Sequence, residues 1–146
     1  MEAALPYPHR YAQCSVAMAF YLFRALQMAG MYVWTQEYWD IWRRMLRKGL
    51  TTCVEDEVGE RSDCHAWGSL ILYELPAVAL GVQPASPGCQ TVCICPEPGY
   101  FTYAKGRVMT PKGMVRVSWS VKDGGSFSYE ASPDLKVIAD TSSLVR

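Results

Sequence analysis

The spacing of apolar residues changes near residue 82, and this change sets the organisation of the whole chain. Within 38–45, apolar side chains recur at positions 38, 41, 42 and 45, the spacing of one helix face. Within 115–122, by contrast, every second residue is apolar, which is the period of a strand with one buried face. The stretch from Gly81 to Gly88 holds two prolines and two glycines, a composition typical of a linker. We therefore predict a helical segment at 1–81, a linker at 82–88 and an antiparallel β domain at 89–146.

Three helices are predicted in the first part, over about 15–29, 35–48 and 66–80. The first is apolar around nearly its whole circumference, so we expect it to be buried on most sides. Thr35 is the candidate N-cap of the second helix. Pro76 lacks a backbone donor and predicts a kink or break in the third helix.

The second part is predicted to form short strands joined by turns. Strands are expected over 91–95, 115–121, 127–131 and 135–139, with Asp123-Gly124 as a hairpin turn. Each strand has one apolar face, which suits two sheets packed face to face. The predicted fold class is α+β, with about three helices followed by an antiparallel β-sandwich-like domain.

Charge and composition narrow the classes of partner. Fourteen Lys and Arg residues balance fourteen Asp and Glu residues, and a net charge of zero disfavours nucleic acid and anionic membranes as partners. The most apolar stretch, 16–33, is interrupted by Arg24 and Gln27, so a buried helix is expected there rather than a membrane span. Only 19% of the residues are charged and 50% are hydrophobic. We therefore expect further protein, or a second copy of the chain, to cover some of the apolar surface.

The compartment is predicted from the N-terminus and the cysteines. The start of the sequence lacks a basic region followed by an apolar one, so no secretory signal is expected and the predicted location is cytoplasmic. The six cysteines form no C-x-x-C pair, which disfavours a zinc site. Free thiols in a reducing compartment are expected, including those of Cys93 and Cys95. No metal and no other cofactor is expected.

The segment Gly49–Ser69 is the candidate functional region. It is a long connection between two predicted helices, and long loops are often functional. It concentrates acidic residues such as Glu55, with His65 and Trp67 close behind. A carboxylate activates water, an imidazole binds hydroxyls and an indole covers an apolar sugar face, so this combination suits sugar chemistry. A solvated acidic loop with a structural histidine is the alternative that composition leaves open.

The order of residues in this segment forms a more specific motif. The string G-x-T-T-x-x-E followed by R-S-D-C-H-A-W resembles the α-L-rhamnosidase family of inverting glycoside hydrolases, glycoside hydrolase family 78. The matching residues are Gly49, Thr51, Thr52, Glu55, Arg61, Ser62, Asp63, Cys64, His65, Ala66 and Trp67. The stretches 20–30 and 38–42 resemble late helices of the family's (α/α)₆ six-hairpin barrel. Those within 80–106 resemble the entry into its C-terminal β-sandwich.

The resemblance implies a mechanism and a role for each residue. In inverting glycosidases a general acid protonates the leaving oxygen while a second carboxylate, about 6.5–9.5 Å away, activates water. Glu55 matches the general base, and His65 matches a contact to a rhamnose hydroxyl or to the base. Trp67 is either a wall of the sugar pocket or a packing residue beneath it. The implied ligand is a carbohydrate with terminal α-L-rhamnosyl groups.

The chain departs from the family in length. Family members are several times longer, and their general acid lies upstream of any segment found here. The chain is therefore expected to be the C-terminal portion of such an enzyme, to lack activity alone, and to need the missing barrel portion as its partner. A non-catalytic carbohydrate-binding module and a purely structural module are the alternatives.

Overall fold

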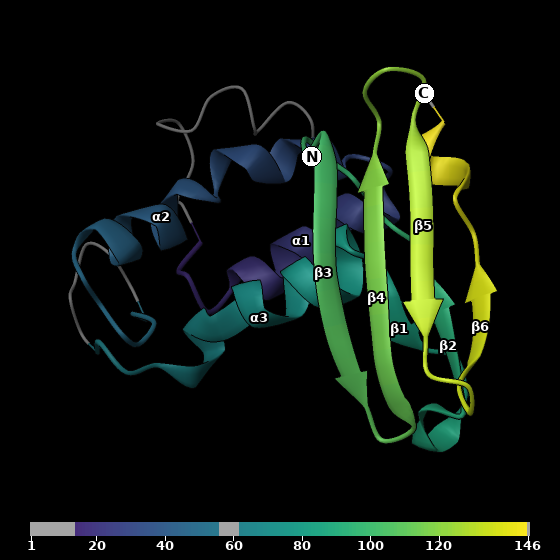
Figure 1. The fold of residues 1–146 in the computed structure, drawn as a ribbon. Coiled ribbons are helices and arrows are strands. Elements are labelled where there is room, and N and C mark those ends of the chain that lie inside the picture. The colour runs from purple at the N-terminus through teal and green to yellow at the C-terminus, as the bar shows by residue number, and fades with distance from the viewer. Residues whose placement is uncertain (1–13, 56–61, 146) are drawn as a thin grey trace. The chain divides into compact units, whose positions relative to one another are not determined.

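The computed structural model describes residues 14–55 and 62–145, and these form two compact units that divide between Ile71 and Leu72 (Figure 1). The division into a helical part and a strand part agrees with the predicted change of period. The boundary between the units, however, precedes the predicted one, and the segment 82–88 is no linker. It contains strand β1 (Val82–Pro84), whose residues pair with β2 inside the second unit. No helix in the described part of the chain is both long and apolar enough to cross a membrane.

The first unit is built from short helices. They are α1 (Ala19–Met28), a 3₁₀ helix (Tyr32–Glu37), α2 (Asp40–Arg47) and a second 3₁₀ helix (Ala66–Leu70), followed by α3 (Ile71–Tyr73) at the boundary of the two units. Gly30 follows the end of α1 with a positive φ of 67°, the left-handed conformation that glycine often supplies after a helix.

An aromatic cluster forms the core of this unit. Phe23, which is fully buried, lies with its ring centroid 5.9–6.2 Å from those of its neighbours Tyr32, Tyr38, Trp39 and Trp42. Three of the four pairs are edge-to-face, an arrangement that the ring quadrupoles favour, and the pair with Trp39 is tilted. The cluster joins α1 to the 3₁₀ helix and to α2.

Helix α1 buries one face in this chain. Ala19, Phe23 and Leu26 are buried, whereas Tyr21 is 66% exposed and Met28 is 90% exposed. The prediction of a helix buried on most sides is therefore wrong for the chain by itself, since α1 meets the rest of its unit along a single stripe. The outer apolar side chains remain in contact with solvent.

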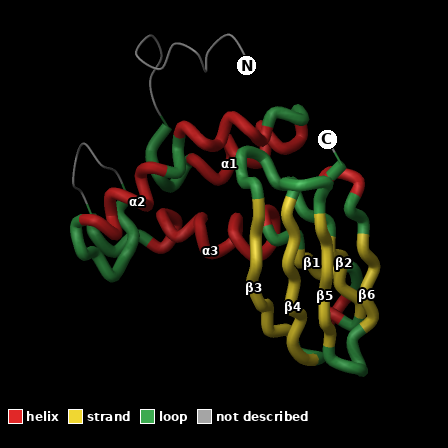
Figure 2. The backbone as a smooth tube through the Cα atoms, turned by 45° about the horizontal axis from the view of Figure 1, so that its top comes forward, coloured by secondary structure: helices red, strands yellow, loops and turns green. Residues whose placement is uncertain are grey.

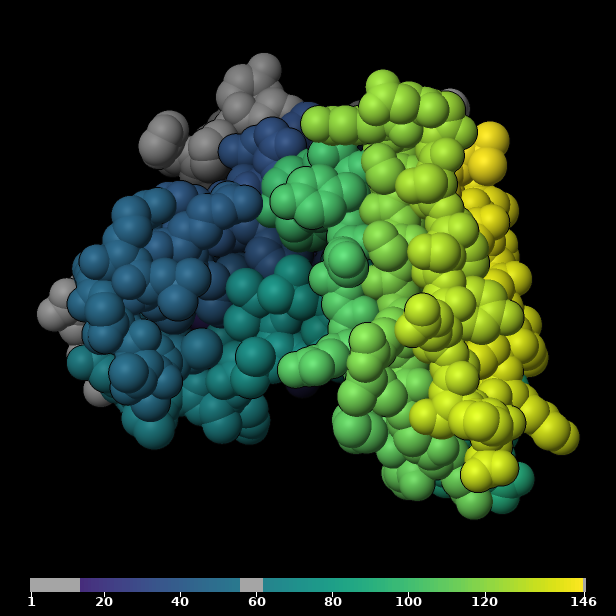
Figure 3. Space-filling view, in the orientation of Figure 1, coloured from purple at the N-terminus to yellow at the C-terminus, as the bar shows by residue number. Residues whose placement is uncertain are grey.

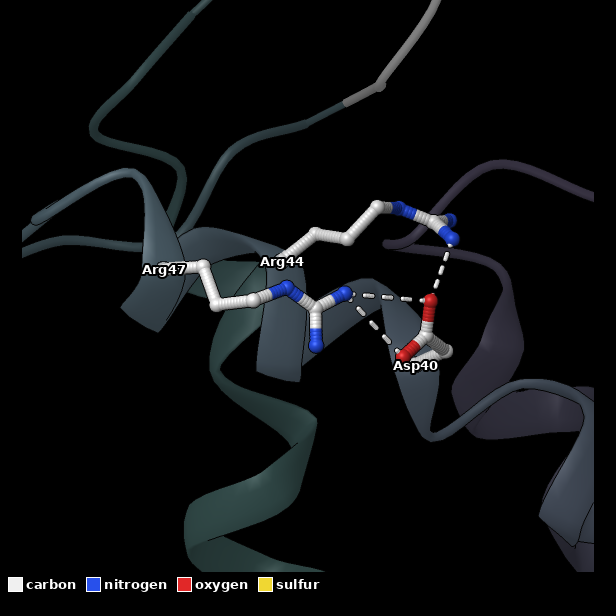
Figure 4. A network of polar contacts seen from close by, with 3 residues as sticks. All are labelled: Asp40, Arg44 and Arg47. Carbon is white, nitrogen blue, oxygen red and sulfur yellow. Dashed lines mark hydrogen bonds and ion pairs between the residues drawn. The ribbon is translucent and has the colours of Figure 1, made fainter.

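Thr35 does not cap the second helix. It lies inside the 3₁₀ helix, fully buried, and its hydroxyl accepts a hydrogen bond of 3.1 Å from Trp39 Nε1. Helix α2 instead begins at Asp40, whose carboxylate pairs with Arg44 at 2.6 Å and with Arg47 at 3.3 Å (Figure 4). The hydrogen bond from Arg47, reinforced by the charges of both arginines, holds the pKa of Asp40 below its usual value. Arg47 is largely exposed and the other two side chains are partly exposed, so this network lies at the solvated surface of the helix.

The predicted break at Pro76 takes the form of a change in helix type. After α3, residues Glu74–Ala79 form a π-helix, and the N–H of Leu80 donates to the carbonyl of Leu75. Proline supplies no N–H to the ladder, and a wider helical turn accommodates that loss.

The second unit contains two three-stranded sheets (Figure 2). One has the order β1-β2-β6 and the other the order β3-β4-β5. The strands not yet bounded are β2 (Thr91–Ile94), β3 (Tyr103–Thr110), β4 (Gly113–Ser120), β5 (Ser126–Ala131) and β6 (Lys136–Ala139). The predicted α+β class is confirmed. One pair departs from the antiparallel prediction, because β2 and β6 run parallel.

The two sheets share one hydrophobic core, as a sandwich requires. Its buried members are Leu80, Val82, Val92, Ile94, Val115, Val117, Trp119, Leu135 and Leu144. Trp119 is 1% exposed, and its Nε1 donates a hydrogen bond of 3.0 Å to the carbonyl of Ala79. This bond connects β4 to the π-helix Glu74–Ala79, which lies at the start of the same unit.

Cys93 and Cys95 form a disulfide, so the prediction of free thiols is wrong for this pair. Cys93 lies in β2 and Cys95 directly follows the end of that strand, with their Cα atoms 5.8 Å apart. Cys14, Cys53, Cys64 and Cys89 are free thiols, as predicted.

Candidate functional site

Backbone hydrogen bonds bring the two halves of the motif together. The N–H of Glu55 donates to the carbonyl of Ser62 at 3.0 Å, and the N–H of His65 donates to the carbonyl of Cys53 at 2.8 Å. The hydroxyl of Thr52 also donates to the carbonyl of Asp63. The segments 52–55 and 62–65 therefore lie side by side in the first unit. Arg61, the remaining motif residue between them, lies outside the described residues.

Glu55 and His65 approach each other across this pairing. His65 Nδ1 is 3.9 Å from Glu55 Oε2, and the two side chains are 27% and 25% exposed. This separation allows an ion pair when the imidazole is protonated and exceeds a direct hydrogen bond. Both groups are half-buried and reachable from solvent, as a carboxylate that activates water must be.

Trp67 completes the group as an exposed ring. Its centroid lies 5.8 Å from that of His65 in an edge-to-face arrangement, and the side chain is 74% exposed. Trp67 lies in the 3₁₀ helix Ala66–Leu70, and its two implied roles, a wall of the sugar pocket or a packing residue, both stay predictions. An exposed indole beside an imidazole and a carboxylate offers an apolar surface next to two polar groups.

Gly68 positions the group and was missed by the sequence analysis. Its carbonyl accepts a hydrogen bond of 2.8 Å from Trp42 Nε1, and its N–H donates to the carbonyl of His65 at 2.9 Å. A Cβ built at this glycine would lie 2.4 Å from the carbonyl oxygen of Val54. The tryptophan of the aromatic cluster thus holds the turn that carries His65 and Trp67 against the residue before Glu55.

We expect Gly68→Ala to destabilise the first unit by about 1–3 kcal/mol, because the new methyl group must push the Val54 carbonyl away. Thermal unfolding followed by tryptophan fluorescence measures the effect. Ser69→Ala, one residue along the same turn, is the control and should leave the melting temperature nearly unchanged. Equal melting temperatures for the Gly68→Ala and wild-type chains would contradict this account of the turn.

Comparisons with known proteins identify relatives of both units. Residues 81–132 match the family model of the bacterial alpha-L-rhamnosidase C-terminal domain. The crystal structure of the GH78 family rhamnosidase of Bacillus sp. GL1 superposes with a TM-score of 0.76 and 32% identity, covering 95% of this chain and 16% of that one. The α-L-rhamnosidase from Dictyoglumus thermophilum superposes with a TM-score of 0.61 and 26% identity, covering 80% of this chain and 14% of that one. No curated protein matched in the corresponding search.

The two kinds of match complement each other. The family model covers only part of the second unit, whereas the Bacillus structure aligns with 95% of this chain and so extends into the first unit. The chain spans only a small part of each solved relative. The sequence motif, the family model and the two structures together confirm that the chain resembles the C-terminal part of a bacterial α-L-rhamnosidase of the GH78 family.

Proposed function

We propose that this chain supplies the general base and two sugar contacts of an inverting α-L-rhamnosidase-like glycoside hydrolase. The observation that carries the proposal is the approach of Glu55 to His65 beside the exposed ring of Trp67. The similarity to two rhamnosidases supports the reaction class. The substrate proposed is a terminal α-L-rhamnosyl linkage.

In the proposed mechanism, Glu55 removes a proton from a water molecule as that water attacks the anomeric carbon. The bond between the anomeric carbon and the leaving oxygen breaks, and a general acid from outside this chain protonates that oxygen. Attack from the opposite face inverts the anomeric configuration. Glu55 then returns its proton to solvent.

His65 and Trp67 hold the sugar in this mechanism. The Nδ1 atom of His65 faces Glu55, which leaves Nε2 for a sugar hydroxyl. Rhamnose is a deoxysugar with a methyl group, and its apolar face packs on the indole of Trp67. The exposed apolar side chains of α1, such as Tyr21 and Met28, are where the remaining barrel is proposed to pack.

A chimera tests the proposal. We expect the 146-residue chain alone to hydrolyse no aryl α-L-rhamnoside, because the general acid is proposed to lie outside it. Replacing the matching 16% of the Bacillus enzyme by this chain should give an active rhamnosidase. Release of the aryl group measures activity, and proton NMR of the first sugar released measures inversion. Turnover by the chain alone, or retention of configuration, would contradict the proposal.

The alternative is a non-catalytic carbohydrate-binding module, which the exposure of Trp67 also favours. The same chimera separates the two functions. A folded but inactive chimera, together with rhamnose binding by the chain that depends on Trp67 and not on Glu55, would favour the alternative.

A further inference from the structure

The outer face of the β3-β4-β5 sheet carries ordered rows of polar side chains. The antiparallel register places Lys105 opposite Ser118, which in turn lies opposite Ser128. The next row contains Arg107, Arg116 and Glu130. Residues two apart on a strand share a face, so these two rows lie side by side on the face opposite the core. Figure 3 shows this sheet in green and yellow-green.

This face carries more positive than negative charge, because its two rows contain three cations and one carboxylate. Arg107 and Arg116 are directly opposed across the two strands, and like charges in that position destabilise a sheet. Glu130 offsets only one of them, since it lies 3.9 Å from Arg116 Nε. Within the described ranges, neither Lys105 nor Arg107 forms an ion pair. An arrangement that costs stability and leaves two cations unpaired is expected where a ligand supplies the missing negative charge.

The surface is also hollowed at these residues. A shallow depression of about 630 Å³ is lined by Lys105, Arg107, Arg116, Ser118, Ser128 and Glu130, together with the backbone between them. Tyr103 lies two residues before Lys105 on the same face and is 68% exposed. Along β3, Tyr103, Lys105 and Arg107 span about 14 Å, which is enough for an extended ligand larger than one ring.

We propose that this face binds a carboxylate-bearing polysaccharide. The cations bind the carboxylates, the two serine hydroxyls exchange hydrogen bonds with sugar hydroxyls, and the exposed tyrosine ring packs on a sugar face. Nucleic acid fits less well, because the chain as a whole has no net positive charge. The proposal uses only residues of the second unit and does not depend on the role of Glu55.

The test measures binding of polygalacturonate oligomers to the full chain by isothermal titration calorimetry. We expect binding that weakens as salt is added, and about tenfold or more weaker binding after Lys105→Gln with Arg107→Gln. The control is Lys112→Gln with Lys136→Gln, which removes the same charge from exposed positions outside the depression. Circular dichroism establishes that both double variants are folded.

Two further ligands test whether binding requires both the carboxylates and the sugars. Fully methyl-esterified oligomers, which have the same sugars without the charge, should bind at least about tenfold more weakly. Polyglutamate, which has the charge without the sugars, should also bind more weakly. The proposal is overturned if polygalacturonate does not bind, if the control variant loses as much affinity as the test variant, or if either probe binds equally well. Loss of hydrolysis in the Glu55 chimera would leave these results unchanged.

Discussion

Replacing Glu55 by glutamine in the active chimera should lower kcat by about 10²–10⁴-fold, the usual contribution of a positioned general base. Glutamine keeps the size and most of the hydrogen-bonding geometry of the side chain but cannot accept a proton from water. Substrate binding depends on other contacts, so KM should change far less than kcat. Initial rates on an aryl α-L-rhamnoside over a range of concentrations separate the two constants.

The matched control is Asp63→Asn, which removes a carboxylate from the exposed part of the same motif. Its kcat should stay within a few-fold of that of the unmodified chimera. His65→Ala should raise KM as well as lower kcat, because this side chain is proposed to bind the sugar and to orient Glu55. An unchanged kcat in the Glu55→Gln chimera would show that Glu55 is not the general base. An equal fall of kcat in Asp63→Asn would show that the total negative charge of the loop, rather than Glu55 itself, sets the rate.

The approach of His65 to Glu55 agrees with one of the two roles that the motif implied for His65, the contact to the base. Glu55 and His65 are ten positions apart in a loop without helical or strand periodicity, so no local pattern places them together. Their approach depends on the pairing of 52–55 with 62–65. It also depends on the bond from Trp42 to Gly68, between residues 26 positions apart. Contacts between residues so far apart produce no pattern in neighbouring sequence positions. The sequence therefore indicated only that Trp42 lies on the apolar face of a helix.

The same limit explains what was missed in the fold. Strand β3 alternates charged residues with Ala104, Gly106 and Val108, and small inward residues give a weak period-two pattern. A Cβ at Gly106 would lie 3.0 Å from a Leu80 methyl group, so this position has room for only a small residue unless Leu80 shifts. Strand β1 is too short for a pattern, and the parallel pairing of β2 with β6 joins segments more than forty residues apart. Strands β4 and β5 were predicted because their alternation is long and their turn chemistry is explicit.

Replacing Trp119 by alanine should destabilise the second unit by about 3–5 kcal/mol, the usual cost of deleting a large buried aromatic side chain. The substitution leaves a cavity between the two sheets, where Val115 and Val117 lose their neighbour. It also leaves the carbonyl of Ala79 without the Nε1 donor that now satisfies it. Small domains are stable by only about 5–15 kcal/mol, so much of the stability of this unit should be lost.

Trp67→Ala is a matched control, because it deletes the same side chain from a position that is 74% exposed rather than 1%. Its effect on stability should stay within about 0.5 kcal/mol. Urea unfolding followed by far-ultraviolet circular dichroism measures both variants on one scale. If the two variants unfold at the same urea concentration, the contact between β4 and the π-helix is not what holds the second unit together. If only Trp119→Ala unfolds early, burial between the sheets accounts for the contribution of Trp119, and the exposed indole of Trp67 contributes little to folding.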